Sequence, residues 1–236
     1  MTLAPWGPVA LWGSTDTIHE SLDDARRVVP SDISFLLEQL NRHLASPVGV
    51  DDIVSVRCGV RPVAVPRERR VDVNHAQFLS RHHRICRDAS MPWISVYGGK
   101  LSGCTTLARE VGRRVTDVIG PPDRPAPDDT ARAEQPSPIT PPTPFRFPTI
   151  DTTMPSPEFS ASYEQCRTLE DFVRRRTNIA QWIPRGGFGR HDEHLDHLRQ
   201  VATAIHRDDA TAALVDLTRY RARVTNEWSV LEGAHA

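Results

Sequence analysis

The segment most suited to binding a ligand is Trp93–Ser102, which reads Trp-Ile-Ser-Val-Tyr-Gly-Gly-Lys-Leu-Ser. A β-branched and aromatic run ends at Gly98 and Gly99, and a helix is expected to follow. Paired glycines let a ligand approach the backbone, and unpaired N–H groups at a helix start favour an anionic or carbonyl oxygen. The glycine spacing excludes a phosphate-binding P-loop. The segment predicts contact with an oxygen-rich ligand, although many turns between a strand and a helix share this pattern and bind nothing.

Lys100, within this segment, is the only lysine among 29 Lys and Arg residues. A GC-rich genome that encodes Arg at most cationic positions is the simplest explanation of that bias. A single retained lysine then suggests that a compact ammonium group is needed where the planar guanidinium would not serve.

Composition limits the classes of function. The chain has 236 residues, 39% of them hydrophobic and 25% charged, and a net charge of −1, which gives no electrostatic reason to expect nucleic acid or an anionic membrane as the main partner. No apolar run approaches the length of a membrane span, and peripheral membrane contact stays open. Four widely spaced cysteines and an N-terminus unlike a signal peptide predict reduced thiols in the cytoplasm.

The pattern predicts three parts: residues 1–119, 120–157 and 158–236. In the first part we expect strands at Val9–Gly13, Ile53–Gly59 and Trp93–Tyr97, and a helix that starts at Ser31. A second helix is expected over residues 102–118. Its inward-facing residues would be Leu101, Thr105, Ala108, Val111 and Val115.

Residues 120–157 contain twelve prolines, which predicts an extended linker or a strap along the surface. A ligand for a proline-recognising domain is the alternative. From Ser160 the chain is expected to be helical: Thr168 with Glu170 and Asp171 is a weak capping signal, and apolar residues then repeat at helical spacing. The predicted fold class is α+β, with a partial mixed sheet and helices, a Pro-rich linker, and a small all-α C-terminal domain.

Further motifs along the chain give the glycine turn a context. They are, in order, Gly13–Asp16 (Gly-Ser-Thr-Asp), Asp32–Leu37 (Asp-Ile-Ser-Phe-Leu-Leu), Asp51–Val54 (Asp-Asp-Ile-Val), Cys58–Pro62 (Cys-Gly-Val-Arg-Pro), Ser80-Arg81, the turn Gly98–Ser102, and Thr168–Thr177 (Thr-Leu-Glu-Asp-Phe-Val-Arg-Arg-Arg-Thr). In order and approximate spacing, this series resembles the C-terminal half of the FAD-dependent glycerol-3-phosphate dehydrogenases. The resemblance covers nearly the whole chain apart from the Pro-rich segment.

The resemblance implies roles for two sets of residues. Arg61 and Arg81 would hold the phosphate of glycerol 3-phosphate, or of a related small phosphorylated polyol, through bidentate hydrogen bonds. The turn residues Gly98, Gly99, Lys100, Leu101 and Ser102 would pack against FAD, where a cation and a helix start stabilise negative charge on the reduced flavin. No catalytic residue can be assigned. The alternative to phosphate binding is a structural role: Arg61 would form an ion pair, and Arg81 would lie in a solvated basic loop.

Two departures from the family pattern matter. The segment Ser102–Thr105 reads Ser-Gly-Cys-Thr where the family usually has Thr-Thr-Tyr-Arg, and the Gly-x-Gly-x-x-Gly dinucleotide fingerprint is absent from the sequence. We therefore expect an N-terminal FAD-binding half to come from a separate chain or from further sequence, and an apolar surface to be exposed where it packs. The alternative is a non-catalytic interaction or regulatory module, derived from the same family, that lacks FAD.

The histidine-rich segment and Cys104 are two further candidates for chemistry. His191, His194 and His197 lie among acidic residues, but they share no single helix face, so a polar helix start is favoured over a metal site and no metal is expected. Cys104 at a helix start could have a lowered thiol pKa, and a small packed residue is the simpler interpretation.

Overall fold

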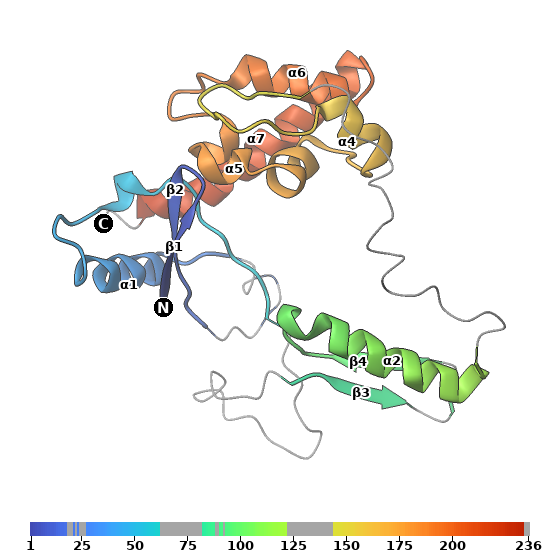
Figure 1. Cartoon of the computed structure of the whole chain (residues 1–236). Helices are drawn as coiled ribbons and strands as arrows, with labels where there is room; N and C mark the ends of the chain where they lie inside the picture. Colours follow the sequence, from blue (N-terminus) through green and yellow to red (C-terminus); the bar gives the residue numbers. More distant parts are fainter. Residues whose placement is uncertain are drawn as a thin grey trace. The chain divides into compact units, whose positions relative to one another are not determined.

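The computed structural model describes residues 1–17, 21, 23, 27–61, 82–87, 90–91, 93–121 and 144–233. They form two compact units, shown in Figure 1. Unit 1 comprises Met1–Thr15, Asp23–Cys58 and Ser137–Ala236, and unit 2 comprises Asp16–Leu22 and Gly59–Pro136. The α+β class is confirmed. In place of one mixed sheet, the described residues contain two separate antiparallel pairs of strands.

Unit 1 begins with a hairpin of β1 (Thr2–Trp6) and β2 (Val9–Gly13), in which Thr2 pairs with Gly13 and Trp6 with Val9. The predicted strand at Val9–Gly13 is thus confirmed. Helix α1 (Pro30–Asn41) begins one residue before the predicted start, because proline is well suited to a first helical turn. The indole N–H of Trp12 donates to the Leu36 carbonyl at 2.8 Å and joins the hairpin to α1.

The segment Ile53–Gly59 was predicted to be a strand, and this is wrong. It follows the short 3₁₀ helix η2 (Val50–Asp52) as chain without strand pairing. Side chains hold it in place: the Ser55 hydroxyl donates to the Gln181 carbonyl at 3.3 Å, and the Arg57 guanidinium lies 5.3 Å from the centre of the Trp6 ring. This β-branched run is therefore an extended segment held by side-chain contacts rather than a paired strand.

The rest of unit 1 is the predicted helical region. It contains α4 (Pro157–Tyr163), the π-helical η5 (Asp171–Arg176), α5 (Ile179–Trp182), the 3₁₀ helix η6 (Arg185–Gly187), α6 (Leu195–Ile205) and α7 (Ala210–Gly233). The capping signal is confirmed, because Asp171 N–H donates to Thr168 Oγ1 and Thr168 N–H to Asp171 Oδ2, both at 3.1 Å. The core of unit 1 lies among these helices, which Figure 1 shows grouped in yellow to red.

The last part of the Pro-rich region belongs to this core. Phe145 pairs with Met154 in an isolated antiparallel bridge, and Phe147 is 2% exposed. Ile150 and Met154 are also buried. Residues 144–157 therefore act as a strap whose apolar side chains fill the helical core. The predicted division at residues 119 and 157 stays a prediction.

Two buried polar side chains of α7, Asp216 and Tyr220, join it to neighbouring segments of unit 1. Asp216 accepts a hydrogen bond from Leu169 N–H at 2.7 Å and lies 2.9 Å from His206 Nε2. The Tyr220 hydroxyl donates to the Gly186 carbonyl at 2.6 Å. These contacts satisfy polar groups that would otherwise be costly to bury.

Unit 2 contains β3 (Arg84–Arg87), β4 (Ile94–Tyr97), the 3₁₀ helix η4 (Leu101–Gly103) and α2 (Cys104–Ile119). The predicted strand and helix are both present. The predicted inward face of the helix is wrong, because no residue of α2 is buried and Leu101 is 90% exposed. In the described residues α2 accompanies only a two-stranded sheet, which is too small to cover its apolar side.

None of the helices in the described part of the chain has both the length and the hydrophobicity of a membrane span.

The four cysteines give a direct test of the packing of unit 1. Cys166 is 1% exposed and lies in its core, whereas Cys58, Cys86 and Cys104 are exposed. Burial raises the pKa of the Cys166 thiol from 9.0 to about 11. We expect three thiols of the folded chain to react quickly with an aromatic disulfide reagent and Cys166 only after unfolding, because the thiolate is the nucleophile.

The variant Cys166→Ser is the control and should lose only the slow class of thiol. Four fast thiols in the folded wild-type chain would contradict the buried position. Because its pKa is raised, the Cys166 thiol also contributes to the stability of the folded chain. This contribution is fully present below pH 9 and is lost as the pH rises through about 11.

Candidate functional site

The turn between β4 and α2 has the geometry that the sequence predicts. β4 pairs with β3 from Arg84 opposite Tyr97 to Arg87 opposite Ile94. The chain leaves β4 through Gly98 with φ 67° and Gly99 with φ 101°, a region of backbone conformation that favours glycine. Two consecutive residues of this kind turn the chain sharply from strand toward helix.

The residues after the glycines lead into the helix start. Lys100 is extended and exposed, with φ −107° and ψ 145°, and one 3₁₀ turn separates it from α2. The N-cap residue of α2 is Gly103, which has no side-chain oxygen, and the N–H groups of Gly103 and Cys104 donate to the Lys100 and Leu101 carbonyls. The turn therefore presents a cation and the positive end of a helix close together in sequence. These groups can stabilise negative charge on a ligand.

Arg61 has a partner that the sequence did not reveal. Its Nη1 donates to Asp16 Oδ2 at 2.6 Å, and both side chains are partly exposed, at 42% and 38%. Asp16 ends the Gly-Ser-Thr-Asp motif, so the ion pair joins two motifs that are 45 residues apart. Arg61 and the glycine turn belong to the same compact unit. Arg81 lies outside the described residues.

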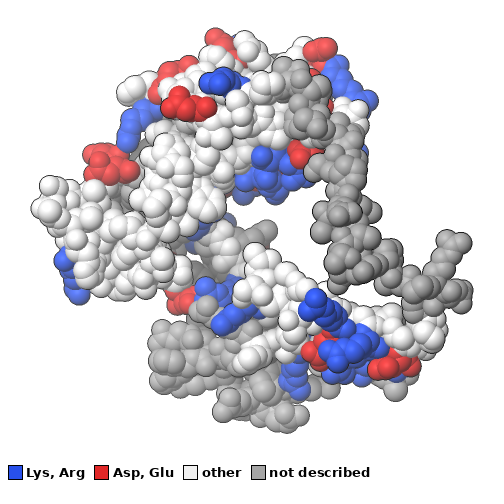
Figure 2. Space-filling model, viewed as in Figure 1, with Lys and Arg blue, Asp and Glu red and all other residues white. Residues whose placement is uncertain are grey.

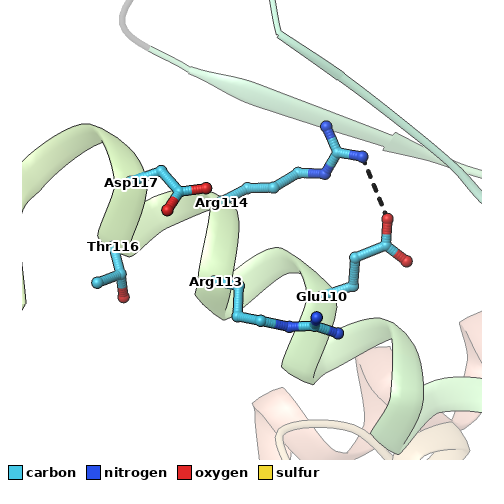
Figure 3. Close-up of a pocket in the computed structure, with 5 residues that line it drawn as sticks. All are labelled: Glu110, Arg113, Arg114, Thr116 and Asp117. Carbon is cyan, nitrogen blue, oxygen red and sulfur yellow. Dashed lines mark hydrogen bonds and ion pairs between the residues drawn. The ribbon is translucent and has the colours of Figure 1, made fainter.

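His83 packs against Gly99 of the turn and Glu110 contacts His83, and the sequence pattern gave no signal for either. His83 Nε2 lies 2.9 Å from Glu110 Oε2, and Glu110 Oε1 accepts from Arg114 Nη2 at 3.2 Å. The pKa of Glu110 is lowered, first by the hydrogen bond from His83 and then by that from Arg114. Figure 3 shows Glu110 and Arg114 reaching toward each other along α2.

An open depression of about 540 Å³ lies beside these residues. In the described part of the chain its lining consists of Glu110, Arg113, Arg114, Thr116 and Asp117. All five are polar and come from α2, and Figure 2 shows basic and acidic side chains gathered over this helix. A ligand pocket is usually lined mainly by apolar groups from several elements, so this depression is not a flavin site by itself.

Of the three clustered histidines, His194 is buried beside the helical core, whereas His191 and His197 are exposed. His194 is 8% exposed, with its ring centre 5.5 Å from that of Phe147, and burial lowers its pKa. Glu193 accepts hydrogen bonds from the N–H groups of Arg190 and His191 at 3.2 and 2.7 Å. Among the residues that the structure describes, no three His, Cys, Asp or Glu side chains are arranged to hold a metal ion.

Comparison with known proteins gives consistent results. The aerobic glycerol-3-phosphate dehydrogenase of Escherichia coli is 28% identical over 130 residues, which are 50% of this chain and 24% of that protein. The mitochondrial glycerol-3-phosphate dehydrogenase of Schizosaccharomyces pombe is 28% identical over 115 residues, 47% of this chain and 18% of that protein. The chain is similar to glycerol-3-phosphate dehydrogenases.

Glycerol-3-phosphate dehydrogenase 1 of Mycobacterium tuberculosis is 26% identical over a longer stretch of 196 residues, which cover 70% of this chain and 37% of that protein. The chain therefore spans about a fifth to a third of the length of these dehydrogenases. No family model matches the chain, and no solved structure gives a significant match.

Proposed function

We propose that this chain contributes half of a flavin site that oxidises glycerol 3-phosphate, or a related phosphorylated polyol, to a ketone. The observation that carries the proposal is the strand–Gly-Gly–helix turn, with two positive-φ glycines, in a chain similar to several glycerol-3-phosphate dehydrogenases. When bound, FAD supplies the hydride acceptor for the alcohol carbon. In the proposal Arg61 and Arg81 hold the substrate phosphate, and Gly98–Ser102 contacts the flavin.

The residues of the turn fit a flavin. Gly98 lacks a side chain at the point where the backbone bends, so a planar ring system can come close to it there, whereas the side of Gly99 on which a Cβ would lie is packed against His83 and Leu107. The exposed ammonium of Lys100 and the N–H groups that follow supply positive charge. A ring that gains electrons is stabilised by this charge, whereas the oxidised neutral ring gains less.

Exposed apolar residues in the described part of unit 2 support the proposal that an FAD-binding half packs against this unit. In unit 2, Trp93 is 55%, Tyr97 is 53% and Ile119 is 77% exposed. Large exposed apolar groups gathered in one small unit commonly mark an interaction surface. We propose that an FAD-binding half, on a separate chain or on further sequence, covers these residues.

A non-catalytic interaction module is the second candidate. The ion pair between Arg61 and Asp16 favours it, because a carboxylate already holds one N–H of the guanidinium that would bind phosphate. The Ser102–Thr105 departure points the same way, since Gly103 weakens the first turn before α2.

Complementation distinguishes the two candidates. We expect the purified chain alone to be colourless and inactive. Co-expression with the part of the Mycobacterium tuberculosis relative that this chain does not cover is expected to give a complex with flavin absorbance that reduces a dye with glycerol 3-phosphate. Glycerol, which lacks the phosphate, is the control substrate and is expected to react far more slowly.

Three results would contradict the enzyme proposal in different ways. Stoichiometric flavin in the isolated chain would show that no second half is needed. Co-purification of the two halves without flavin would support the interaction module. A flavin-containing complex that oxidises glycerol and glycerol 3-phosphate equally would remove the phosphate-binding role.

A further inference from the structure

The backbone of the glycine turn is packed against His83. A Cβ atom placed on Gly99 would lie 3.3 Å from His83 Cβ and 3.7 Å from Leu107 Cδ2. His83 precedes β3, and Leu107 lies in the first turn of α2. The turn is therefore enclosed between the start of the hairpin and the start of the helix. Any movement of His83 changes the space that Gly99 occupies.

A hydrogen bond fixes His83 in this position. His83 Nε2 and Glu110 Oε2 are 2.9 Å apart, and the two side chains are only 27% and 34% exposed. The second oxygen of Glu110 is held by Arg114 at 3.2 Å, as Figure 3 shows. Each carboxylate oxygen of Glu110 thus has its own partner. Arg114, Glu110 and His83 form a continuous series of contacts, and His83 packs against Gly99.

Few other contacts can hold the turn in place. No residue of α2 is buried, and the large apolar side chain next to Lys100, Leu101, is 90% exposed. Apolar packing in the described part of unit 2 therefore contributes little to the position of the helix relative to the hairpin. Polar contacts with defined geometry become correspondingly more important.

We infer that His83 is a positioning residue for the Gly98–Ser102 turn, held against Gly99 by Glu110. Its effect on a flavin rests on the proposed function, whereas its effect on the turn does not. His83 acts through the backbone of the turn and touches neither of the groups that would react. Its role is to keep the glycine backbone and the N–H groups after Lys100 in the conformation that meets the ligand.

The first experiment uses the whole chain without flavin. Amide hydrogen exchange at Gly103 and Cys104, whose N–H groups donate to the Lys100 and Leu101 carbonyls, is measured by NMR in the wild type and in His83→Ala, Glu110→Ala and His83→Gln. We expect exchange about tenfold faster in the two alanine variants, because the loss of a hydrogen bond to a charged group permits local opening. His83→Gln should restore slow exchange, since its amide can still donate to Glu110.

His82→Ala is the matched control, because His82 is the exposed neighbour of the same residue type. It should leave exchange at Gly103 and Cys104 unchanged. Unchanged exchange in His83→Ala would overturn the inference, whether or not the chain ever binds flavin.

The second experiment uses the complemented complex. His83→Ala is expected to weaken FAD binding about tenfold and to shift the flavin midpoint potential, and His83→Gln to restore both. Weak binding in both variants would show that the imidazole itself contacts the ligand and would overturn the positioning role. If the wild-type complex holds no FAD, the proposed function fails, while the exchange measurements still decide the role of His83 in the turn.

Discussion

Phe172→Ala is expected to lower the free energy of unfolding of unit 1 by about 3–5 kcal/mol. The Phe172 side chain is 0% exposed and lies in the middle of the helical core. Its ring meets that of Phe145 edge to face, with centroids 5.7 Å apart. Truncation removes this contact and leaves a cavity that the surrounding helices can only partly fill. Urea denaturation followed by circular dichroism measures the loss.

Phe35→Ala is the matched control. Phe35 lies on α1 and is 45% exposed, so the same truncation should cost less than about 1 kcal/mol. Equal losses in the two variants would mean that the helical core is much looser than the burial of Phe172 indicates.

Local periodicity explains why the helical region could be predicted. Leu198, Val201, Ala202 and Ile205 repeat at helical spacing, and all four are buried in α6. The Thr168–Asp171 capping pair is also a local signal, because its two partners lie three residues apart. In each case the residues that decide the structure lie within one or two turns of each other.

Prediction failed where a distant partner decides the structure. Ile53–Gly59 has a strand-like composition, but its side chains contact Gln181 and Trp6 and its backbone pairs with no strand among the described residues. The pattern of α2 correctly gave a helix, yet its apolar side is exposed because the described residues provide too little to cover it. Sequence pattern records which face is apolar and says nothing about which surface covers it.

The same difference between local signals and distant partners applies to the candidate site. Gly98 and Gly99 predict the turn, because positive φ is a local requirement that glycine meets. The contact between His83 and Glu110 joins residues 27 positions apart, and no repeat or motif connects them. Asp16 ends the Gly-Ser-Thr-Asp motif, but only the fold shows that it forms an ion pair with Arg61.

Arg61→Ala is expected to reduce kcat/KM for glycerol 3-phosphate about 10- to 100-fold in the complemented complex, mainly through a higher KM. A guanidinium that holds a phosphate through charged hydrogen bonds contributes about 1.5–3 kcal/mol, which corresponds to this range. Asp16 occupies one N–H of the group, and the planar fork has further donors that can face the phosphate. Steady-state dye reduction at varied substrate concentration measures the effect.

The choice of substrates and variants separates phosphate binding from a structural ion pair. If Arg61 binds the phosphate, Arg61→Ala leaves the slow oxidation of unphosphorylated glycerol unchanged, because that substrate never uses the guanidinium. Arg87→Ala, which removes an exposed arginine on β3, should leave both substrates unaffected. Asp16→Asn keeps the guanidinium but removes its ion pair, so it should affect KM less than Arg61→Ala. If instead both variants destabilise unit 2 equally and leave KM unchanged, the ion pair is structural and Arg61 does not bind the phosphate.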